Sequence, residues 1–473
     1  MRVSPDGYYQ LHELTRQYAE EKLNAASKAA LRDAHALYYA ALLDQQKAHM
    51  YTAAYRDVWT TVGGELDNIR HAWQWLVEAI NTGRQVLPVT ILLRQIAAVF
   101  AYYYLFESLT LVGQSLFTHA CQAMETAGWA THEDATGGCH SPPATLVHLR
   151  LITGLFHYER GHFRAGLAVA EQAIDPCRAL SLEDDLLLAL LLYGRTQMRR
   201  GAAVEATAAL QEALALGQQL GSPHSCAEAL LSLGMVASNQ GHYAEAQSYL
   251  QQGLALSQEI GYQPWVARAL NNLGTTYSRQ HDYQQAKPYY EQALTIAQEA
   301  GDQNFIMITT SNLGGVYAGF GQVELSLTQY QRSLSMARNA GDERWIAANL
   351  NGLATTYLAM NDLTAAEHVL REALAVGQQS DSTPDTLGSI ARLGHLFARR
   401  GRLEPALKAL TFVEQHPVAM ARDRLYNQPL LAELRSELPP SLFEQAAAWA
   451  DDQALDGVVR WLLHSESSFP VVV

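Results

Sequence analysis

The chain has 473 residues, too many for one ordinary hydrophobic core, so several domains or a repeat array is expected. Apolar residues make up 48% and charged residues 17%, a balance that excludes a disordered chain. With 33 basic and 47 acidic residues the net charge is −14, the wrong sign for a protein that binds mainly to nucleic-acid phosphates. Four cysteines make no disulfide framework, and no secretory signal follows Met1. We therefore expect a cytoplasmic location, with neither nucleic acid nor a membrane as partner.

Residues 8–19 form a pattern of a short strand that leads into a helix. This stretch, Tyr-Tyr-Gln-Leu-His-Glu-Leu-Thr-Arg-Gln-Tyr-Ala, resembles the last strand and helix of the winged-helix subdomain of STAND-type (NB-ARC) regulatory ATPases. In that family a Met-His-Asp-like triplet stands here and its histidine senses the bound nucleotide, so the resemblance implies such a role for His12. Leu11 replaces the methionine and Glu13 the aspartate. Residues 65–76 resemble the helical linker that joins this subdomain to a repeat array in the same family.

The most apolar window of the chain runs from Val86 to Phe106. Arg94 and Gln95 interrupt this window, and three consecutive tyrosines, residues 102–104, end it. A membrane span needs about 20 predominantly apolar residues, so this window is a poor candidate for one. We predict a helix that is buried in a protein core.

Two groups of residues have the side chains of a metal site without its spacing. The stretch from His12 to Arg16 begins like the zincin motif His-Glu-x-x-His, but the arginine stands where the second histidine is needed. Six further residues lie within thirty positions of one another and match no paired ligand motif: His119, Cys121, His132, Cys139, His140 and His148. Packing and solvation explain them better, so we expect no metal and no other cofactor.

Four series of positions, each with its own residue type, recur every 40 residues between about residue 145 and residue 412. One series predicts the turns between paired helices: Gly161, Gly201, Gly241, His281, Gly321, Asn361 and Gly401. Two series hold only small residues: Gly154, Gly194, Gly234, Gly274, Gly314, Ala354 and Gly394, and Gly166, Ala206, Ala246, Ala286, Ser326, Ala366 and Ala406. A fourth marks the repeat ends: Gly221, Gly261, Gly301 and Gly341. Apolar residues between them recur at steps of three, four or seven, the period of a helix.

The repeated pattern resembles the tetratricopeptide-repeat signature in a long, 40-residue variety. The resemblance rests on Leu273-Gly274, Tyr277, Tyr283, Ala286, Tyr290 and Ala293 and on their equivalents in the other repeats. It implies an all-α fold, an α-solenoid of about seven helical hairpins whose first helices line a concave face. The recurring tyrosines, which include Tyr317 and Tyr330, stand at packing positions, so we predict core residues and no ligand-stacking row.

The regions outside the repeats set the domain organisation that we predict. Residues 1–24 would be a remnant of the winged-helix subdomain and residues 25–144 a helical linker domain. The solenoid would occupy residues 145–412, and residues 413–473 would form a C-terminal helical cap, because residues 442–459 resemble the end piece of such arrays. The family's phosphate-binding loop needs a Gly-Lys-[Ser/Thr] step, which the sequence lacks. We therefore expect no ATPase core and no nucleotide hydrolysis in this chain.

Polar residues on the first helices are the best candidates for a binding site. If Leu273 and Gly274 are the packing pair of their helix, a set of polar side chains points toward the groove: Arg268, Asn271, Asn272, Ser278 and Arg279, with Asn312 and Asn351 in the next two repeats. Asparagine can bond a peptide backbone as both donor and acceptor, and arginine can hold a carboxylate through two hydrogen bonds. The alternative is that these side chains are ordinary solvated polar residues.

The leading functional hypothesis is a non-enzymatic binding module for a protein, a peptide or a small effector, the sensor half of a STAND-type signal-transduction regulator. Two alternatives remain at this stage. One is a pure scaffold that assembles protein partners without switching. The other is a regulator that works in trans with a separately encoded NB-ARC-type ATPase.

Overall fold

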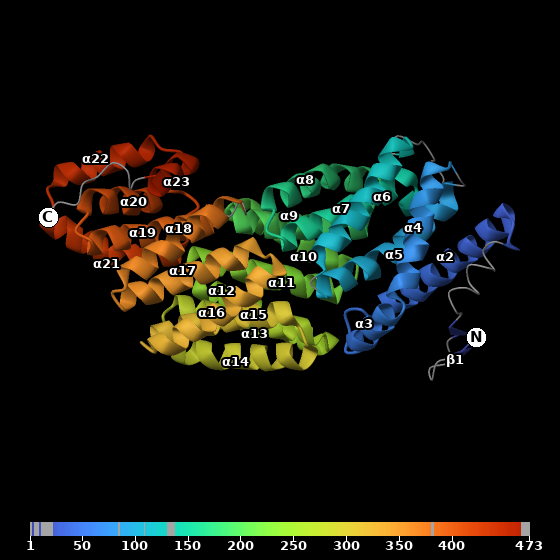
Figure 1. The fold of residues 1–473 in the computed structure, drawn as a ribbon, viewed down its shortest axis with the longest axis horizontal. Coiled ribbons are helices and arrows are strands. Elements are labelled where there is room, and N and C mark those ends of the chain that lie inside the picture. Colours follow the sequence, from blue (N-terminus) through green and yellow to red (C-terminus); the bar gives the residue numbers. More distant parts are fainter. Residues whose placement is uncertain are drawn as a thin grey trace. The chain divides into compact units, whose positions relative to one another are not determined.

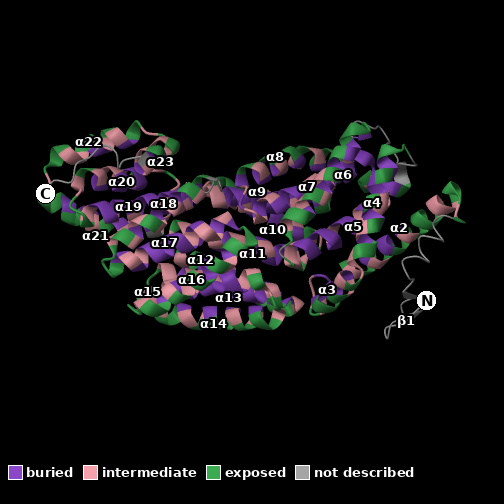
Figure 2. Cartoon of the chain, viewed as in Figure 1, coloured by how far each residue is buried: buried purple, intermediate pink, exposed green. Residues whose placement is uncertain are grey.

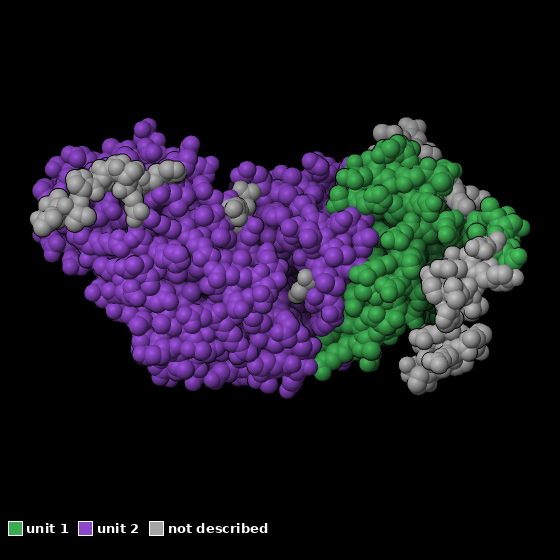
Figure 3. Space-filling model, viewed as in Figure 1, with its two compact units in different colours: residues 1–50, 54–103, 118–149 green, residues 51–53, 104–117, 150–473 purple. Residues whose placement is uncertain are grey.

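A computed structural model describes residues 2–3, 9–10, 22–83, 86–107, 109–129, 138–379 and 383–464. The chain divides into two compact units (Figure 3). The first contains residues 1–50, 54–103 and 118–149, and the second contains residues 51–53, 104–117 and 150–473. The predicted repeats lie almost entirely within the second unit.

The first unit is helical apart from two short strands. β1 (Arg2–Val3) pairs antiparallel with β2 (Tyr9–Gln10), so the strand predicted near residue 8 is present. His12, for which the resemblance implies nucleotide sensing, and the helix predicted after it lie outside the described residues. The helices that follow are α2 (Ala25–Lys47), α3 (Tyr55–Gly64), α4 (Leu66–Asn81), and parts of α5 (Val86–Phe106), α6 (Thr110–Thr126) and α7 (Pro142–Glu159), with a 3₁₀ turn at Gly138–His140. Trp75 on α4 donates its indole N–H to Asp33 on α2, at 2.8 Å.

Helix α5 contains the apolar window. Among the described residues, Pro88–Phe106 is the one stretch long and apolar enough to cross a membrane by length and composition. Leu93, Ile96, Ala97 and Phe100 of this stretch are fully buried within the protein. This burial agrees with the predicted core helix.

Seven helical hairpins follow one another in the order that the 40-residue period predicts (Figure 1). The first pairs α7 with α8 (Phe163–Ala179), and the next three pair α9 (Glu183–Arg200) with α10 (Ala203–Gln219), α11 (Pro223–Gln240) with α12 (Tyr243–Ile260), and α13 (Gln263–Arg279) with α14 (Tyr283–Ala300). The last three pair α15 (Gln303–Gly319) with α16 (Val323–Ala340), α17 (Glu343–Ala359) with α18 (Leu363–Gln379), and α19 (Thr383–Arg399) with α20 (Leu403–Gln415). The α-solenoid is confirmed.

The turns within the hairpins have the backbone geometry that their residues predict. Gly241 has a φ of 85°, and the six equivalent positions also have positive φ. Glycine adopts this left-handed conformation without steric cost, which is why it ends most of the first helices. His281 and Asn361 adopt it too, each with a φ of 60°. All seven predicted turns are therefore confirmed.

The two series of small residues meet where the helices of each hairpin pack most closely. A Cβ placed on Gly274 would lie 3.2 Å from the carbonyl oxygen of Ala286, and Gly234 stands in the same relation to Ala246. Ala246 and Ala286 are fully buried. Buried residues line the sides of the helices that face their neighbours, as Figure 2 shows along α11, α13 and α17. The predicted close contact is present in five of the seven hairpins, the first to the fourth and the seventh.

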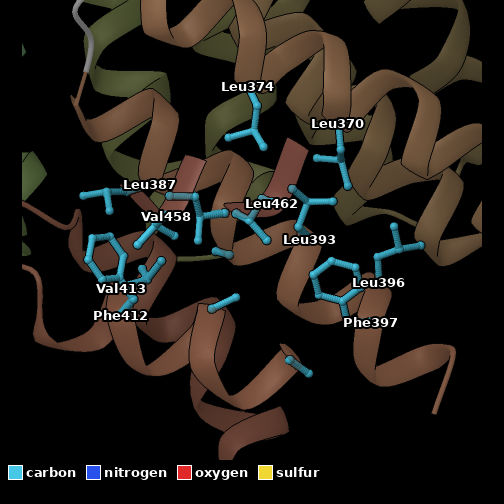
Figure 4. Packing of buried hydrophobic residues seen from close by; sticks show 14 of the residues in the cluster. Leu370, Leu374, Leu387, Leu393, Leu396, Phe397, Phe412, Val413, Val458 and Leu462 are labelled. Carbon is cyan, nitrogen blue, oxygen red and sulfur yellow. The ribbon is translucent and has the colours of Figure 1, made fainter. Parts of the chain in front are cut away.

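Three further helices follow the last hairpin: α21 (Ala421–Glu437), α22 (Pro440–Asp451) and α23 (Leu455–His464). Val458 and Leu462 of α23 join the buried cluster of α18, α19 and α20, which includes Leu370, Leu393 and Phe412 (Figure 4). Helix α23 thus covers the apolar side of the last hairpin, which has no further hairpin to pack against, as the end of a solenoid requires.

Hairpin two and hairpin seven also contact each other, although four hairpins lie between them in the sequence. Helix α19 packs against α9, and the segment after α20 lies against the turn at Gly201. A Cβ on Gly201 would lie 2.4 Å from the Cβ of Val418, so the second turn has no room for a side chain. Repeat arrays ordinarily contact only their neighbours, so this contact adds a long-range constraint.

The close contact at Ala286 yields a stability prediction. Ala286→Leu inserts three carbon atoms between two helices that touch, so we expect a loss of about 1–3 kcal/mol in the free energy of unfolding. Gln292→Leu, at an exposed position of the same helix, is the matched control and should change stability little. Urea denaturation of both variants measures the difference, and equal stability would contradict the assigned contact.

Candidate functional site

The residues predicted to bind a ligand lie on three successive first helices. Arg268, Asn271, Asn272, Ser278 and Arg279 lie on α13, Asn312 lies on α15 and Asn351 lies on α17. We define the first-helix face as the positions that correspond, in steps of 40 residues, to Arg268, Asn271, Asn272, Thr275, Ser278 and Arg279. This definition lets the same positions be compared in all seven hairpins.

Three of the predicted asparagines take part in bonds that join neighbouring first helices. The Asn312 side chain donates to Asn271 Oδ1 at 2.8 Å, which links α15 to α13. Asn351 Oδ1 accepts from the Ser389 hydroxyl at 2.9 Å, which links α17 to α19. Asn271 and Asn351 are buried, whereas Asn272 and Asn312 are partly exposed. Asn272 and Asn312 therefore remain partly accessible to solvent, whereas Asn271, Asn351 and the donating group of Asn312 join neighbouring helices.

The end of α13 is also tied to its neighbours. Arg279 donates to the Ser238 hydroxyl of α11 at 2.8 Å. Ser278 lies beside the hydroxyl of Tyr290, which donates to Thr275 Oγ1 at 3.1 Å. Tyr290 is buried, as its packing position predicts. These bonds fix the direction of the polar side chains that remain at the surface.

An arginine that the sequence analysis did not single out connects three first helices. Arg195 on α9 donates to Glu159 of α7 at 2.9 Å and to Glu228 of α11 at 2.6 Å. Its guanidinium carbon also lies 4.2 Å from the centre of the Tyr158 ring, in a cation–π contact. Only 11% of the Arg195 side chain is exposed. All three charged residues stand on the first-helix face, since they correspond to Thr275, Arg279 and Arg268.

Arginines from later hairpins approach the same carboxylate. Burial would raise the pKa of Glu159, but the charges of Arg195, Arg344 and Arg268 outweigh it and hold this pKa below its usual value. Arg344 lies at the start of α17, bonded to Asp342 at 3.1 Å, with 7% of its side chain exposed. First helices of hairpins one, two, three, four and six therefore contribute charges to one network.

Tyr158 takes part in this network through its hydroxyl. Burial raises the pKa of the phenol, but Arg199 and Arg195 act in the opposite direction and bring it down to about 8. Arg199 Nε lies 3.4 Å from the Tyr158 hydroxyl. A buried tyrosine near pH 8 can therefore carry a negative charge that the two arginines stabilise.

The chemistry of this face is that of recognition. It presents amides, hydroxyls, guanidinium groups and carboxylates at repeated spacing, which suits hydrogen bonding to a peptide backbone or to a polar ligand. No group of three or more His, Cys, Asp or Glu side chains that could hold a metal occurs in the part of the chain that the structure describes, from which His132 is missing. Cys139 is exposed and Cys121 is buried, and neither forms a disulfide.

The network at Arg195 yields a second prediction. Arg195→Met leaves Glu159 and Glu228 without their partner in a mostly buried place, so we expect a loss of about 2–3 kcal/mol. The matched control is Arg178→Met, because Arg178 forms a similar pair with Glu212 on second helices, at 2.7 Å, but 50% and 46% of these side chains are exposed. An exposed pair is worth about 1 kcal/mol or less. Chemical denaturation of both variants compares them, and equal losses would mean that Arg195 contributes no more than a surface arginine.

The pKa of Tyr158 can be measured by difference spectroscopy of the phenolate. The chain has 23 tyrosines, so the titration of Tyr158→Phe is subtracted from that of the wild type. We expect the difference to titrate near pH 8 and to move upward in Arg199→Gln. Because this pKa is lower in the folded than in the unfolded chain, the ionised tyrosine adds stability as pH rises from about 8 to about 10. A difference that titrates at or above pH 10 would contradict the network.

Comparisons with known proteins agree with this architecture. A model of the tetratricopeptide repeat matches residues 185–259 and 225–299, and a model of the MalT-like TPR region matches residues 263–456. No relative among curated proteins matches the sequence.

Solved structures show the same kind of fold at low sequence identity. The Rap conjugation gene regulator of plasmid pLS20, in complex with the Phr* peptide, is 14% identical, with a TM-score of 0.50. The match covers 72% of this chain and 96% of the regulator's chain. A Rap protein complexed with competence and sporulation factor is 16% identical, with a TM-score of 0.48 and coverages of 75% and 98%. A STAND protein with a tetratricopeptide-repeat sensor from Pyrococcus horikoshii is 13% identical, with a TM-score of 0.42, and the match spans 79% of this chain but only 55% of that protein. Models of tetratricopeptide-type repeats thus match residues 185–456, and the seven hairpins from α7 to α20 form a TPR-like α-solenoid.

Proposed function

We propose that the chain is a non-enzymatic sensor module that binds a peptide, a protein or a small effector on its first-helix face. The observation that supports this most is a pair of amides at one register on two successive first helices. Asn272 and Asn312 stand one repeat apart on α13 and α15, and both remain partly exposed. An extended peptide that crosses these helices would meet equivalent amides at regular intervals.

The charged network adds a reason to place the ligand on this face. Arg268 lies near both Glu159 and Asp302, so its charge belongs to the network that joins first helices of several hairpins. A polar ligand bound beside it would meet side chains that are already held in place by one another. Such preorganisation lowers the entropy that binding must overcome.

A role within a STAND-type regulator is the finer part of the proposal. It is supported by the resemblance of residues 8–19 and 65–76 to that family, and the strand at Tyr9–Gln10 fits the resemblance. In this proposal the array senses the effector, and an NB-ARC-type ATPase, in the same polypeptide or in another one, receives the signal. A pure scaffold would bind partners on the same face without any effect on an ATPase.

The binding role predicts that single amides matter. We expect Asn272→Ala and Asn312→Ala each to weaken the bound partner by about 1 kcal/mol or more, the usual scale of a lost hydrogen bond. Native mass spectrometry of the chain purified from its own host identifies the partner, and calorimetric titration at two salt concentrations measures the affinity. Tyr290→Phe is the control, because it removes a buried hydrogen bond to Thr275 and should change stability with little effect on affinity.

Two outcomes of this titration would contradict the proposed site. One is an unchanged affinity in both asparagine variants. The other is binding that disappears as salt rises, because an acidic chain attracts any basic ligand over a long range and salt screens that attraction. Binding that survives salt and depends on both asparagines supports the first-helix face.

A further inference from the structure

The chain itself occupies its first-helix face at one place. In hairpin seven this face holds the N-terminal half of α21, because Arg392 of α19 lies 3.5 Å from Asp423 Oδ1 and 5.6 Å from the centre of the Tyr426 ring. The His395 ring of α19 contacts the Tyr426 ring at a tilt of 32°, with ring centres 4.1 Å apart, and its Nε2 lies 3.3 Å from Asn427 Oδ1. Arg392 and His395 correspond to Asn272 and Thr275 of the fourth hairpin.

The partners on α21 form a pattern that one helix can present to another. Asp423, Tyr426 and Asn427 are spaced three and four residues apart, so they lie on one side of α21. Asp423 and Asn427 are buried at this contact. Arg392 is further fixed by donating to Thr355 Oγ1 at 2.8 Å and to the Gly388 carbonyl at 2.7 Å. The receiving side chains on α19 are therefore held in place by their own helix and by α17.

The two halves of α21 are held by different forces. Leu431 and Leu434, in the C-terminal half, are buried in an apolar cluster with Leu407, Leu410 and Ala446 of α20 and α22. The N-terminal half contacts α19 through polar groups and the turn at Gly241 through Ala421. Pro429 stands between the halves, inside the helix, where it removes one backbone hydrogen bond and weakens the helix. The C-terminal half of α21 is thus anchored by apolar packing, the N-terminal half contacts α19 mainly through polar groups, and Pro429 weakens the helix between them.

The segment before α21 extends this contact to the second and third hairpins. Val418 fills the space above Gly201, and the Ala421 Cβ lies 3.6 Å from where a Cβ of Gly241 would be. Arg424 donates to the His416 carbonyl at 3.0 Å, which ties this segment to α21. Residues 416–428, which we call the arm, therefore form one unit that contacts both α19 and the turns of hairpins two and three.

We propose that α19 carries a helix-binding site whose occupant in this structure is the arm, and that the arm detaches by bending at Pro429. The ligand class of the site is a helical peptide with an aspartate, a tyrosine and an asparagine at positions i, i+3 and i+4. The inference rests on the proposed function in one respect, since the occupied positions correspond to those assigned to an external ligand. A ligand that crosses the array toward hairpin seven competes with the arm for α19.

Hydrogen exchange of the full chain tests the detachment. Backbone amides of residues 423–428 should exchange at least about tenfold faster than those of residues 431–437, because opening of the arm leaves the apolar half in place. Equal, slow exchange in the two halves would overturn the hinge at Pro429.

A disulfide lock provides the matched variant for this measurement. Gly241→Cys with Ala421→Cys places two Cβ atoms at the spacing that a disulfide needs. Cys139 is exposed and is replaced by serine in the same chain to prevent mispairing. The oxidised protein should lose the fast exchange of residues 423–428, and reduction should restore it. Persistence of the fast exchange in the oxidised protein would mean that the arm does not move as one unit.

A peptide titration tests the binding site itself. Asp423→Asn with Tyr426→Ala should release the arm, and circular dichroism checks that the variant keeps its helix content. A fluorescent synthetic peptide of residues 416–437, with the natural sequence, should bind this variant at least about tenfold more tightly than the wild type. Adding Arg392→Gln should abolish the gain, and adding Arg178→Gln on the distant second helix α8 should leave it unchanged. A folded variant with no gain, or a gain unaffected by Arg392→Gln, would overturn the proposal.

The two proposals fail in different ways. If the external ligand does not bind the first-helix face, the asparagine variants keep their affinity while the exchange and peptide results still stand. If the arm is a fixed part of the fold, the exchange and peptide results fail while Asn272→Ala and Asn312→Ala still weaken the partner.

Discussion

The close approach of two helices at a pair of small residues is the constraint on which the structure depends. In the fourth hairpin a Cβ on Gly274 would lie 3.2 Å from the Ala286 carbonyl and 3.0 Å from the Tyr290 ring, so a side chain there would push its neighbours apart. The same contact recurs at multiples of 40 residues in the second, third and seventh hairpins, where it limits how far apart the two helices lie. A constant spacing within hairpins is what allows equivalent positions on successive first helices to form a continuous face.

The polar groups on this face then connect hairpins that packing alone would leave independent. Arg195 joins three neighbouring first helices, and the charge of Arg344 reaches the same carboxylate from the sixth hairpin. The arm and the contact between α9 and α19 connect the second hairpin with the seventh. A change at one hairpin can therefore reach distant ones through direct contacts, which is a physical basis for a sensor that responds as a whole.

The fold was predictable because its determinants are local and repeated. Turns need glycine, asparagine or another residue that tolerates positive φ, and the helix contacts need small residues, so both appear in the sequence at a fixed period. Of the candidate site, the period gave the register of Asn272 and Asn312. It did not show that Asn271 and Asn351 are buried partners of neighbouring helices, since this depends on how adjacent hairpins lean together.

The charged network and the arm were missed for a related reason. Arg195 lies 36 residues from Glu159 and 33 residues from Glu228, so neither spacing equals the period and no motif search connects them. A charged residue soon after the apolar run Leu186–Leu192 was the available signal, because a charge at a mostly buried position usually has a partner. The contact between α19 and α21 joins a repeat to a segment outside the period, and its partners are identified only once the chain is folded.

The central claim is that the array recognises its partner through the first-helix face, and position-specific photo-crosslinking tests it most directly. A photoreactive phenylalanine derivative replaces Asn272 on the first helix α13 in one chain and Gln292 on the second helix α14 in another. After irradiation in the native host, we expect one defined adduct at position 272 and none at position 292. The same adduct at both positions, or an adduct at position 292 alone, would contradict the account, because the second helices would then carry the binding surface.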